Sequence, residues 1–488
     1  MQLTRRTFLG IFAAGAGAAL LAACSQSSPA SPTAAPAAAP TTAAKPTAAP
    51  TTAVAKPTSA AAPTSAANPT VAPTAAAAAP AKGSGTFTYW GGLIFSDDAN
   101  NLEQTTIQDW GKKAGYSTVD AVMINQNETN QKVAAALQSG SMPDALDMGT
   151  DLLLQLANGN KLVSLDDLYG TIGSAHGGWV KSADQATDPK IFGGHRAGIP
   201  FGTSGNILNM RKDILEAAGF KGAPATWMDL RDWAQKAQKP PKYWGIGFAL
   251  SNVGDGNEQV DWLHSWGGRI ADDEGATCTI KSQETKDYLQ FITDAYVKMN
   301  LFPPGVTTWD GAGDNNAYQS GKAIFIGNPG SVFLWMKKND PDLASKSAYS
   351  AFPKGPKLQV DSQSPDVRAI PVGGKNIDQA KDLLTFLANG DYNAKYMINA
   401  IYGPVLVDQQ KFENVWTADP VHAGLLDLAL HGSGPSWPDV NNAAYAEFND
   451  NFLVPKMIQR AVINKWDLDK AIDEAQTTGA AIYAKHKA

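Results

Sequence analysis

Side chains capable of catalysis occur throughout this chain, but none stands at the spacing of a common catalytic motif. Gly202-Thr203-Ser204-Gly205 lacks the spacing of a G-x-S-x-G nucleophile elbow, and the sequence has no H-E-x-x-H, Walker loop or C-x-x-C. The six histidines do not cluster at metal-ligand spacing. The acidic stretches around Asp273 and Asp310 do not match an EF-hand loop. We therefore expect no cofactor, no metal and no enzymatic activity.

The residue types that bind carbohydrates are concentrated in residues 83–488, where all 13 tryptophans lie. Aromatic faces stack on the apolar C–H face of a sugar ring, and carboxylates and amides exchange hydrogen bonds with its hydroxyls. The same region carries 35 basic against 46 acidic residues, which argues against nucleic acid or anionic lipid as a partner. Because paired carboxylates also serve glycoside hydrolysis, a secreted carbohydrate-active enzyme (glycoside hydrolase or lyase) remains an alternative.

The stretch 196–239 carries four sequence features in a familiar order. Ile199-Pro200 precedes Asn209-Met210-Arg211-Lys212-Asp213, and Ala217-Ala218-Gly219-Phe220 follows. Pro224-x-Thr226-Trp227-x-Asp229-Leu230 comes last, with the spacing of a capping box in which Asp replaces the usual Glu. This order resembles the extracellular solute-binding proteins that serve ABC importers of sugars, the maltose-binding-like group (family 1). The resemblance covers essentially all of residues 85–488.

The N-terminus agrees with this resemblance. Thr4-Arg5-Arg6-Thr7-Phe8-Leu9 resembles a twin-arginine export signal, and the apolar stretch 10–23 is too short to span a bilayer. Leu21-Ala22-Ala23-Cys24 resembles a lipobox, so residues 1–23 are expected to be a signal peptide and Cys24 the lipidated first residue. Residues 25–82 are almost entirely Ala, Pro, Thr and Ser, which predicts a disordered tether between the lipid anchor and the folded region.

Cysteine usage places no further constraint on the fold. With Cys24 assigned to lipidation, Cys278 is alone and no intrachain disulfide is expected in the mature protein. We interpret Cys278 as a small buried hydrophobic residue.

Hydrophobic patterns predict the elements that must position the binding residues. Strands are expected at 86–92, 119–124 and 244–250, and helices at 128–139, 152–158, 258–266, 282–299 and 378–389. This alternation indicates an α/β protein with mainly parallel sheets. About 400 residues exceed one ordinary core, so two lobes are expected. The resemblance implies a periplasmic-binding-protein-like fold with a hinge and an interlobe ligand cleft. Lobe 1 would comprise 83–206 and 369–408, and lobe 2 would comprise 207–368 and 409–488.

Residue types and the resemblance together indicate ten candidate ligand-binding residues on cleft-lining loops. A core position is the alternative for Trp90 and for Trp262, which shares a helical face with Trp266. A helix N-cap is the alternative for Asp151, whose loop faces the ligand in the family. The candidates are Trp90, Asp151, Ser204, Asn257, Glu258, Trp262, Trp309, Asp310, Asn328 and Trp437.

One stretch departs from the family pattern. Maltose-binding relatives have an aromatic platform after a Gly-Pro step, whereas this chain has Gly327-Asn328-Pro329-Gly330 with no aromatic before Phe333. This departure argues against maltodextrin as the ligand, and Asn328 could exchange hydrogen bonds at that place instead. Trp437 lies in a loop whose counterpart in the family carries a stacking aromatic.

These patterns predict a lipid-anchored substrate-binding protein of an ABC importer on the extracytoplasmic face of the membrane. It would be a monomer that captures a mono- or oligosaccharide and delivers it to the transmembrane permease subunits. A non-sugar solute such as a polyol phosphate is the alternative within the same architecture, and clustered Arg and Lys in the cleft would favour it.

Overall fold

The computed structural model of the chain describes residues 83–94 and 96–487. The predicted signal peptide, Cys24 and the predicted tether lie outside the described residues. Within the described part of the chain, no helix is both long and apolar enough to cross a membrane. The strands of that part form two sheets, one of five strands and one of four.

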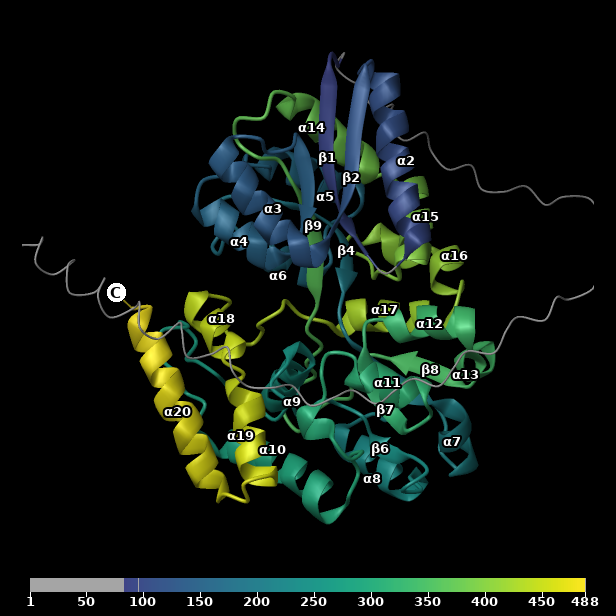
Figure 1. Cartoon of the computed structure of the whole chain (residues 1–488), viewed down its shortest axis with the longest axis vertical. Coiled ribbons are helices and arrows are strands. Elements are labelled where there is room, and N and C mark those ends of the chain that lie inside the picture. The colour runs from purple at the N-terminus through teal and green to yellow at the C-terminus, as the bar shows by residue number, and fades with distance from the viewer. Residues whose placement is uncertain (1–82, 95, 488) are drawn as a thin grey trace, which may run out of the picture. The chain divides into compact units, whose positions relative to one another are not determined.

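The first sheet has the strand order β2-β1-β3-β9-β4. Its strands are β1 (Thr86–Leu93), β2 (Thr118–Asn125), β3 (Ala145–Met148), β4 (Ile199–Ser204) and β9 (Ser364–Ala369). Its helices are α2 (Asp97–Ala114), α3 (Gln126–Ser139), α4 (Thr150–Asn158), α5 (Asp166–Ala175), α6 (Lys181–Ala186), α14 (Ile377–Leu387) and α15 (Gly390–Ala400). In Figure 1, α3 and α4 lie on one side of the strands, and α2 and α15 lie on the other.

Alternation along β1 explains these two layers. Phe87 and Tyr89 point into a buried cluster with Trp110 of α2, while Trp90 packs on the opposite side among residues of α3 and α4. Phe87 contacts the Trp110 ring edge-on, with 5.2 Å between the ring centroids. The apolar side chains of α2 and α4 therefore cover opposite faces of the same sheet.

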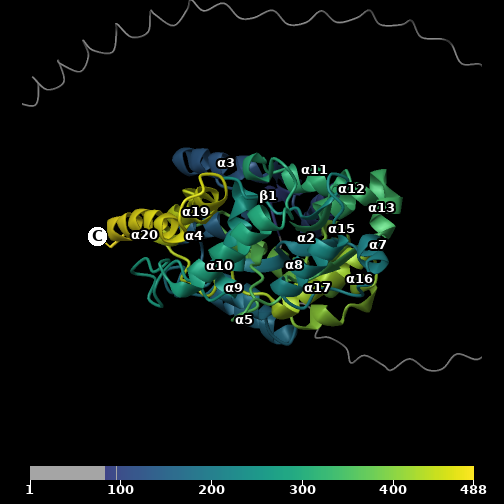
Figure 2. The same cartoon turned by 90° about the horizontal axis from the view of Figure 1, so that it is seen from below.

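The second sheet has the order β6-β7-β5-β8. Its strands are β5 (Ile207–Arg211), β6 (Trp244–Ile246), β7 (Ala323–Asn328) and β8 (Ser347–Ser350). The helices around it are α7 (Lys212–Ala217), α8 (Trp227–Ala237), α9 (Glu258–Ser265), α10 (Gln283–Thr293), α11 (Gly313–Gln319), α12 (Ser331–Asn339), α13 (Pro341–Ser345) and α17 (Pro420–His431). The C-terminal helices α18 (Ala443–Asp450), α19 (Leu453–Val462) and α20 (Leu468–Lys485) complete its core. Helices α19 and α20 lie side by side in both views (Figures 1 and 2).

Several predicted elements are confirmed. Thr226 Oγ1 accepts a 3.0 Å hydrogen bond from the Asp229 amide, and an Asp229 carboxylate oxygen accepts one from the Thr226 amide, so the capping box begins α8 as predicted. The helix expected at 282–299 is α10 continued by a π-helical turn, Asp294–Lys298. The strand expected at 244–250 is shorter in the structure, where β6 ends at Ile246. Cys278 is buried, as expected.

The expectation of mainly parallel sheets is wrong. Strand β9 runs antiparallel to both β3 and β4, and β5 runs antiparallel to both β7 and β8. Both reversed strands directly adjoin a connection between the sheets. Only residues 205 and 206 separate β5 from the end of β4, and β9 receives the chain returning from β8. Strands that enter a sheet from the other lobe need not follow the right-handed crossover that makes neighbours parallel.

The chain passes between the sheets at residues 205–206 and again at residues 351–363. A third passage lies between Leu406 and Val421 and includes the short helix α16 (Glu413–Trp416). Leu406 packs in the first core, whereas Val421 of α17 packs with residues of β5 and β7. The predicted boundary at 368/369 falls inside β9, which belongs to the first sheet from Ser364 on. Apart from this shift, the predicted limits of the lobes stay a prediction.

Candidate functional site

Two adjoining cavities share part of their lining, and the second of them is lined by elements of both sheets. The first, about 240 Å³, is lined mainly by residues 92–94, 129–130 and 147–152. The second, about 290 Å³, is lined by Ser204 and by residues 329–331 and 400–402. Both are lined by Ile94, Ser364, Asp366 and Tyr402. We call these two cavities together the cleft. Its walls come from both lobes and its floor from the connecting strands.

The shared floor is a hydrogen-bonded group on β9. Tyr402 Oη donates a 2.5 Å hydrogen bond to Asp366 Oδ2, and burial raises the pKa of Asp366 to about 6. The Ser364 hydroxyl lies 3.1 Å from that of Thr150, the first residue of α4. Ser204 Oγ donates to the Ser364 carbonyl at 3.5 Å. These contacts tie the loop before α4 to the strands that cross between the sheets.

A buried ionic network supports the first cavity from below. Arg368 Nη2 donates a 2.7 Å hydrogen bond to Glu103 Oε1, and Arg368 Nε lies 3.5 Å from Asp147 Oδ1. Asp147 also accepts hydrogen bonds from the Tyr89 hydroxyl and from the Gly92 amide. Burial raises the pKa of Glu103 to about 8, with the Asp147 charge adding and Arg368 opposing. The network ties Gly92 of β1 and Asp147 of β3 to Arg368 of β9.

A second group of acids lies at the carboxyl end of β7. It comprises Asp255, Glu258 and Asp314, and we call it the acidic cluster. Glu258 accepts a hydrogen bond from Asn206 Nδ2, in the first connection between the sheets. Burial raises the pKa of Glu258 well above its ordinary value, and Asp314, Asp255 and Asp261 add to this increase. Burial and Asp255 raise the pKa of Asp314 to about 7.

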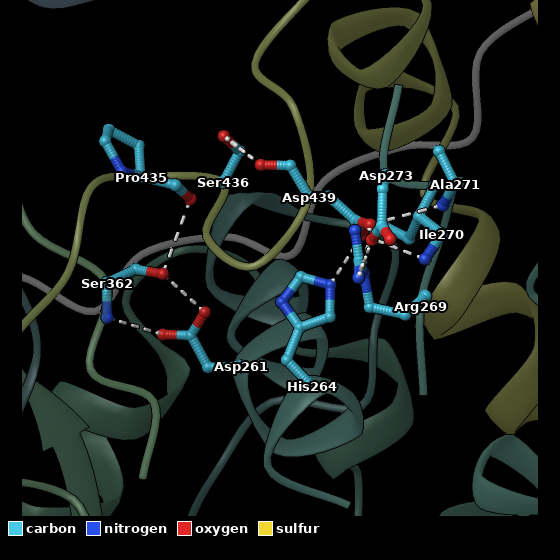
Figure 3. Close-up of polar contacts among 10 residues, drawn as sticks. All are labelled: Asp261, His264, Arg269, Ile270, Ala271, Asp273, Ser362, Pro435, Ser436 and Asp439. Carbon is cyan, nitrogen blue, oxygen red and sulfur yellow. Dashed lines mark hydrogen bonds and ion pairs between the residues drawn. The ribbon is translucent and has the colours of Figure 1, made fainter. Parts of the chain in front are cut away.

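The segments that connect the two sheets form a group of polar contacts, part of which Figure 3 shows. Ser362 donates from its amide (3.1 Å) and hydroxyl (2.6 Å) to the two carboxylate oxygens of Asp261 in α9. Gln363 donates from its amide to the Ser433 carbonyl at 3.0 Å, and Thr203 and Gly403 exchange two backbone hydrogen bonds. Short paired connections of this kind restrict relative movement of the lobes to bending about them.

Four of the ten predicted residues lie in or beside the cleft. Asp151 lines the first cavity and Ser204 the second. The N-cap residue of α4 is Gly149, and Asp151 is the second residue of the helix. The alternative role of Asp151 as an N-cap is therefore not seen. Burial and Asp450 raise the pKa of Asp151. Asn257 and Glu258 begin α9, and Asn257 Nδ2 donates to the Asn449 carbonyl at 3.1 Å.

Two predicted residues have structural positions instead. Trp262 is 0% exposed and stacks on Trp227 with 3.7 Å between ring centroids, because its face of α9 packs against α8. This overturns the expectation that Trp262 contacts the ligand, and its core alternative is confirmed. Asn328 is 3% exposed, and its Oδ1 accepts hydrogen bonds from the Gly330 and Val332 amides at the start of α12. The amide of Asn328 is therefore committed to the chain itself.

The remaining four predicted residues lie outside the lining of the cleft. Trp309 and Asp310 line a separate cavity with Trp244 and Lys322. Lys132 Nζ lies 4.5 Å from the Trp90 ring centroid, and Lys181 Nζ lies 5.3 Å from that of Trp437. Both rings are half-buried. Their roles as sugar platforms stay predictions.

Sequence reasoning missed the residues of the cleft floor. Ser364, Asp366 and Tyr402 belong to segments interpreted only as the return of the chain to the first lobe. No local motif marks them, because their proximity depends on β9 and the end of α15 meeting in space. The one available signal was the segment Tyr402-Gly403-Pro404, which places an aromatic residue directly at a chain turn.

A cleft walled by two α/β lobes and floored by their connecting strands defines a two-lobed binding protein. A family model described as bacterial extracellular solute-binding protein matches residues 106–394. The chain belongs to this family, and it is a solute-binding protein of an ABC transporter that acts outside the cytoplasm. The resemblance found in the sequence is thus confirmed.

Individual relatives agree with this assignment. A probable ABC transporter-binding protein of Deinococcus radiodurans is 26% identical over 353 residues, covering 70% of this chain and 81% of the relative. Maltose-bound MalE3 of T. maritima has a TM-score of 0.66 at 20% identity, covering 81% of this chain and 99% of that chain. The sugar-binding protein MalE of Xanthomonas citri has a TM-score of 0.70 at 16% identity, covering 82% and 98%. At these identities the solved structures show the shared two-lobed fold.

Proposed function

We propose that this protein captures a mono- or oligosaccharide in the cleft and delivers it to a membrane permease. The observation that carries the proposal is a cavity in the first lobe that adjoins a second cavity, whose lining comes from both lobes and from the strands between them. A ligand that contacts both walls stabilises the closed arrangement of the lobes, which is the form a permease recognises. The sugar-binding names of the solved relatives support the saccharide class.

The lining itself supports a hydroxyl-rich ligand over a phosphorylated one. Hydroxyls of Ser204, Ser364 and Thr150 and the carboxylates of Asp151 and Asp366 face the cavities. Neither lining includes Arg or Lys, the residues that recognise phosphate. Binding without turnover is the proposed role.

A thermal-shift screen of the purified full chain against sugars, polyols, sugar phosphates and peptides tests the ligand class. A ligand at 100 times its Kd adds about 2.7 kcal/mol to the folded state, which gives a clear rise in Tm. Stabilisation by a sugar that is lost in Asp151→Asn supports the proposal, with the exposed Glu216→Gln as the control variant. Stabilisation by phosphates or peptides alone, or turnover of a glycan, contradicts it.

We further propose that Cys24 is lipidated after twin-arginine export and that residues 25–82 tether the folded region to the membrane. The protein would act as a monomer. The support is the lipobox-like Leu21-Ala22-Ala23-Cys24 at the end of the apolar stretch. Metabolic labelling with a fatty acid tests the anchor. Label on the wild type and none on Cys24→Ala, with release of the variant from membranes, is the expected result; equal membrane retention of both contradicts it.

A further inference from the structure

The charged residues that line the cleft are all acidic. Asp147, Asp151 and Asp366 line its cavities, and neither lining includes a Lys, Arg or His. Arg368 compensates Asp147 from beneath, but no described basic side chain forms an ion pair with Asp151 or Asp366. Across from Asp151, Asp450 at the end of α18 lies near enough to raise the pKa of Asp151. The charges of Asp151 and Asp450, which belong to different lobes, therefore repel each other.

The acidic cluster adds three further carboxylates beside the second cavity. Glu258 binds Asn206, two residues from Ser204 of the cavity lining, and Asp314 lies 3.5 Å from Nδ2 of Asn328, which directly precedes Pro329 of the lining. The cluster is therefore at the carboxyl end of β7, where open α/β sheets bind their ligands.

One oxygen of the cluster is left without a partner. Asp314 is 6% exposed, and its Oδ1 accepts no hydrogen bond from the described residues. The Glu258 carboxylate lies against Gly327 and the Asp314 carboxylate against Asn328, two consecutive residues of β7, and the Asp314 charge adds to the raised pKa of Glu258. Asn257 Oδ1, one residue away from Glu258, is also buried without a donor. Each of these oxygens needs a hydrogen that the described chain does not supply.

Several other buried acids of the described chain have a cation or hydrogen-bond donors beside them. Arg368 neutralises Glu103 and Asp147, Arg269 and His264 contact Asp439, and Ser362 gives Asp261 two hydrogen bonds. The acidic cluster has no such cation. Buried carboxylates without a partner are costly, so such a group points to a partner that arrives with the ligand. Within the described residues no set of three His, Cys, Asp or Glu is arranged to hold a metal ion, which favours an organic cation.

We propose that the ligand carries a protonated amine and that the acidic cluster binds this amine, as in an amino sugar or another polyhydroxylated amine. This inference rests on the proposed function, and it specifies the charge of the saccharide. The hydroxyls of such a ligand would hydrogen-bond to Asp366, Ser204 and Ser364. Its ammonium group would donate hydrogen bonds to Asp314 Oδ1 and Asn257 Oδ1, which have no donor within the described chain. A bound cation would also relieve the repulsion between Asp151 and Asp450 and so favour closure.

Calorimetric titration of the full chain with matched ligands tests the charge. Glucosamine, glucose and N-acetylglucosamine differ at one substituent, and chitosan and chitin oligosaccharides give the same comparison at greater length. We expect the free amine to bind roughly 30-fold or more tightly than its neutral counterparts, as for a desolvated charge pair. Equal affinity for neutral and amino sugars overturns the inference and leaves the proposed function standing. Binding of spermidine with no sugar binding supports the charge and overturns the saccharide class.

Two variants test the place of the amine. Glu258→Gln keeps an acceptor for Asn206, and Asp314→Asn keeps the side-chain shape, so both should fold with a Tm near that of the wild type. Each should reduce the preference for the amine at least about 10-fold, and Glu216→Gln should leave it unchanged. An amine preference that survives in both variants overturns the assignment to the acidic cluster.

Discussion

The hydroxyl of Tyr402 donates a 2.5 Å hydrogen bond to Asp366, and these two residues line both cavities of the cleft. Asp366 belongs to β9 and Tyr402 follows α15, so the bond joins two segments that return the chain to the first lobe. The bond opposes the effect of burial on the pKa of Asp366. It also orients the carboxylate toward the space that a ligand would occupy.

Replacing this hydroxyl should weaken ligand binding. Tyr402→Phe removes the donor, raises the pKa of Asp366 further and leaves its orientation free. We expect a loss of about 10-fold in ligand affinity and about 1.5–3 kcal/mol in the free energy of unfolding, as for a hydrogen bond to a charged group. Calorimetry and urea unfolding measure the two effects. Tyr296→Phe, a half-buried tyrosine outside the cleft lining, is the control, and equal effects in both variants would contradict the assignment.

The connection between the sheets should respond to pH through Asp361. Burial raises the pKa of Asp361 from 3.8 to about 8, with Asp261 and Asp427 adding and the Phe352 amide and Gln359 opposing. A raised folded-state pKa contributes stability that is complete below the unfolded value and is lost as pH rises through the folded value. The contribution of Asp361 to the unfolding free energy should therefore fall between about pH 4 and pH 8. Chemical denaturation across this range should give a flatter curve for Asp361→Asn; curves of equal slope would contradict the prediction.

The buried pair of Asp439 and His264 should have the opposite pH dependence. His264 Nε2 lies 2.9 Å from Asp439 Oδ2, and Arg269 Nε donates to Asp439 Oδ1 at 2.7 Å (Figure 3). Burial opposes ionisation, but His264 and Arg269 hold the pKa of Asp439 below its ordinary value of 3.8. Its stabilisation is therefore present above pH 3.8 and is lost as pH falls further.

The substitution Asp439→Asn should accordingly cost about 3–5 kcal/mol of unfolding free energy at pH 7. This difference from the wild type should shrink below pH 3.8. Asp273, which contacts the same Arg269 with a side chain 87% exposed, gives the matched control. Asp273→Asn should change the unfolding free energy by at most about 1 kcal/mol. Urea unfolding of both variants at pH 7 and pH 3 decides between this pattern and an equal loss in both.

The core tryptophans should affect stability without defining ligand specificity. Trp262→Ala removes a ring that stacks on Trp227 and contacts Phe248, so we expect a loss of about 3–5 kcal/mol. Because Trp262 lies outside the cleft lining, the Kd of the surviving folded protein should stay within about threefold of the wild type. Titration at a temperature well below the Tm of the variant measures this. A large loss of affinity with unchanged stability would restore the ligand role that the structure denies.

The cap at Asn328 gives a fifth measurable effect. Its Oδ1 accepts hydrogen bonds from the amides of Gly330 and Val332 at the beginning of α12. Asn328→Ala should therefore lower the unfolding free energy by about 1–2 kcal/mol. Asn328→Asp keeps the acceptor but places a second carboxylate beside Asp314, so it should raise the pKa of Asp314 above about 7. NMR titration of the Asp314 carboxyl carbon checks this direction, and an unchanged or lower pKa would contradict it.

Local sequence patterns were sufficient for much of the fold. The capping box at Thr226 and Asp229, the strand β1 and the helix before Gly140 depend on residues only a few positions apart, so short-range hydrogen bonds and hydrophobic spacing suffice to predict them. The ordered set of motifs between Ile199 and Leu230 also identified the family. The strand directions could not be read in this way, because β5 and β9 acquire theirs from the passage between two lobes.

The sequence by itself determined the class of protein, the two-lobed α/β architecture and the abundance of acids and aromatics from which a binding site could be built. Only the tertiary structure decided which of them face the cleft. Trp262 and Asn328 have the residue types of ligand contacts, yet packing against Trp227 and capping of α12 commit them to the chain. Asp366 and Tyr402 carry no local signature and come together although 36 positions separate them in the sequence. Side-chain partners are set by which surfaces the folded chain buries against each other, and one-dimensional spacing contains little of that information.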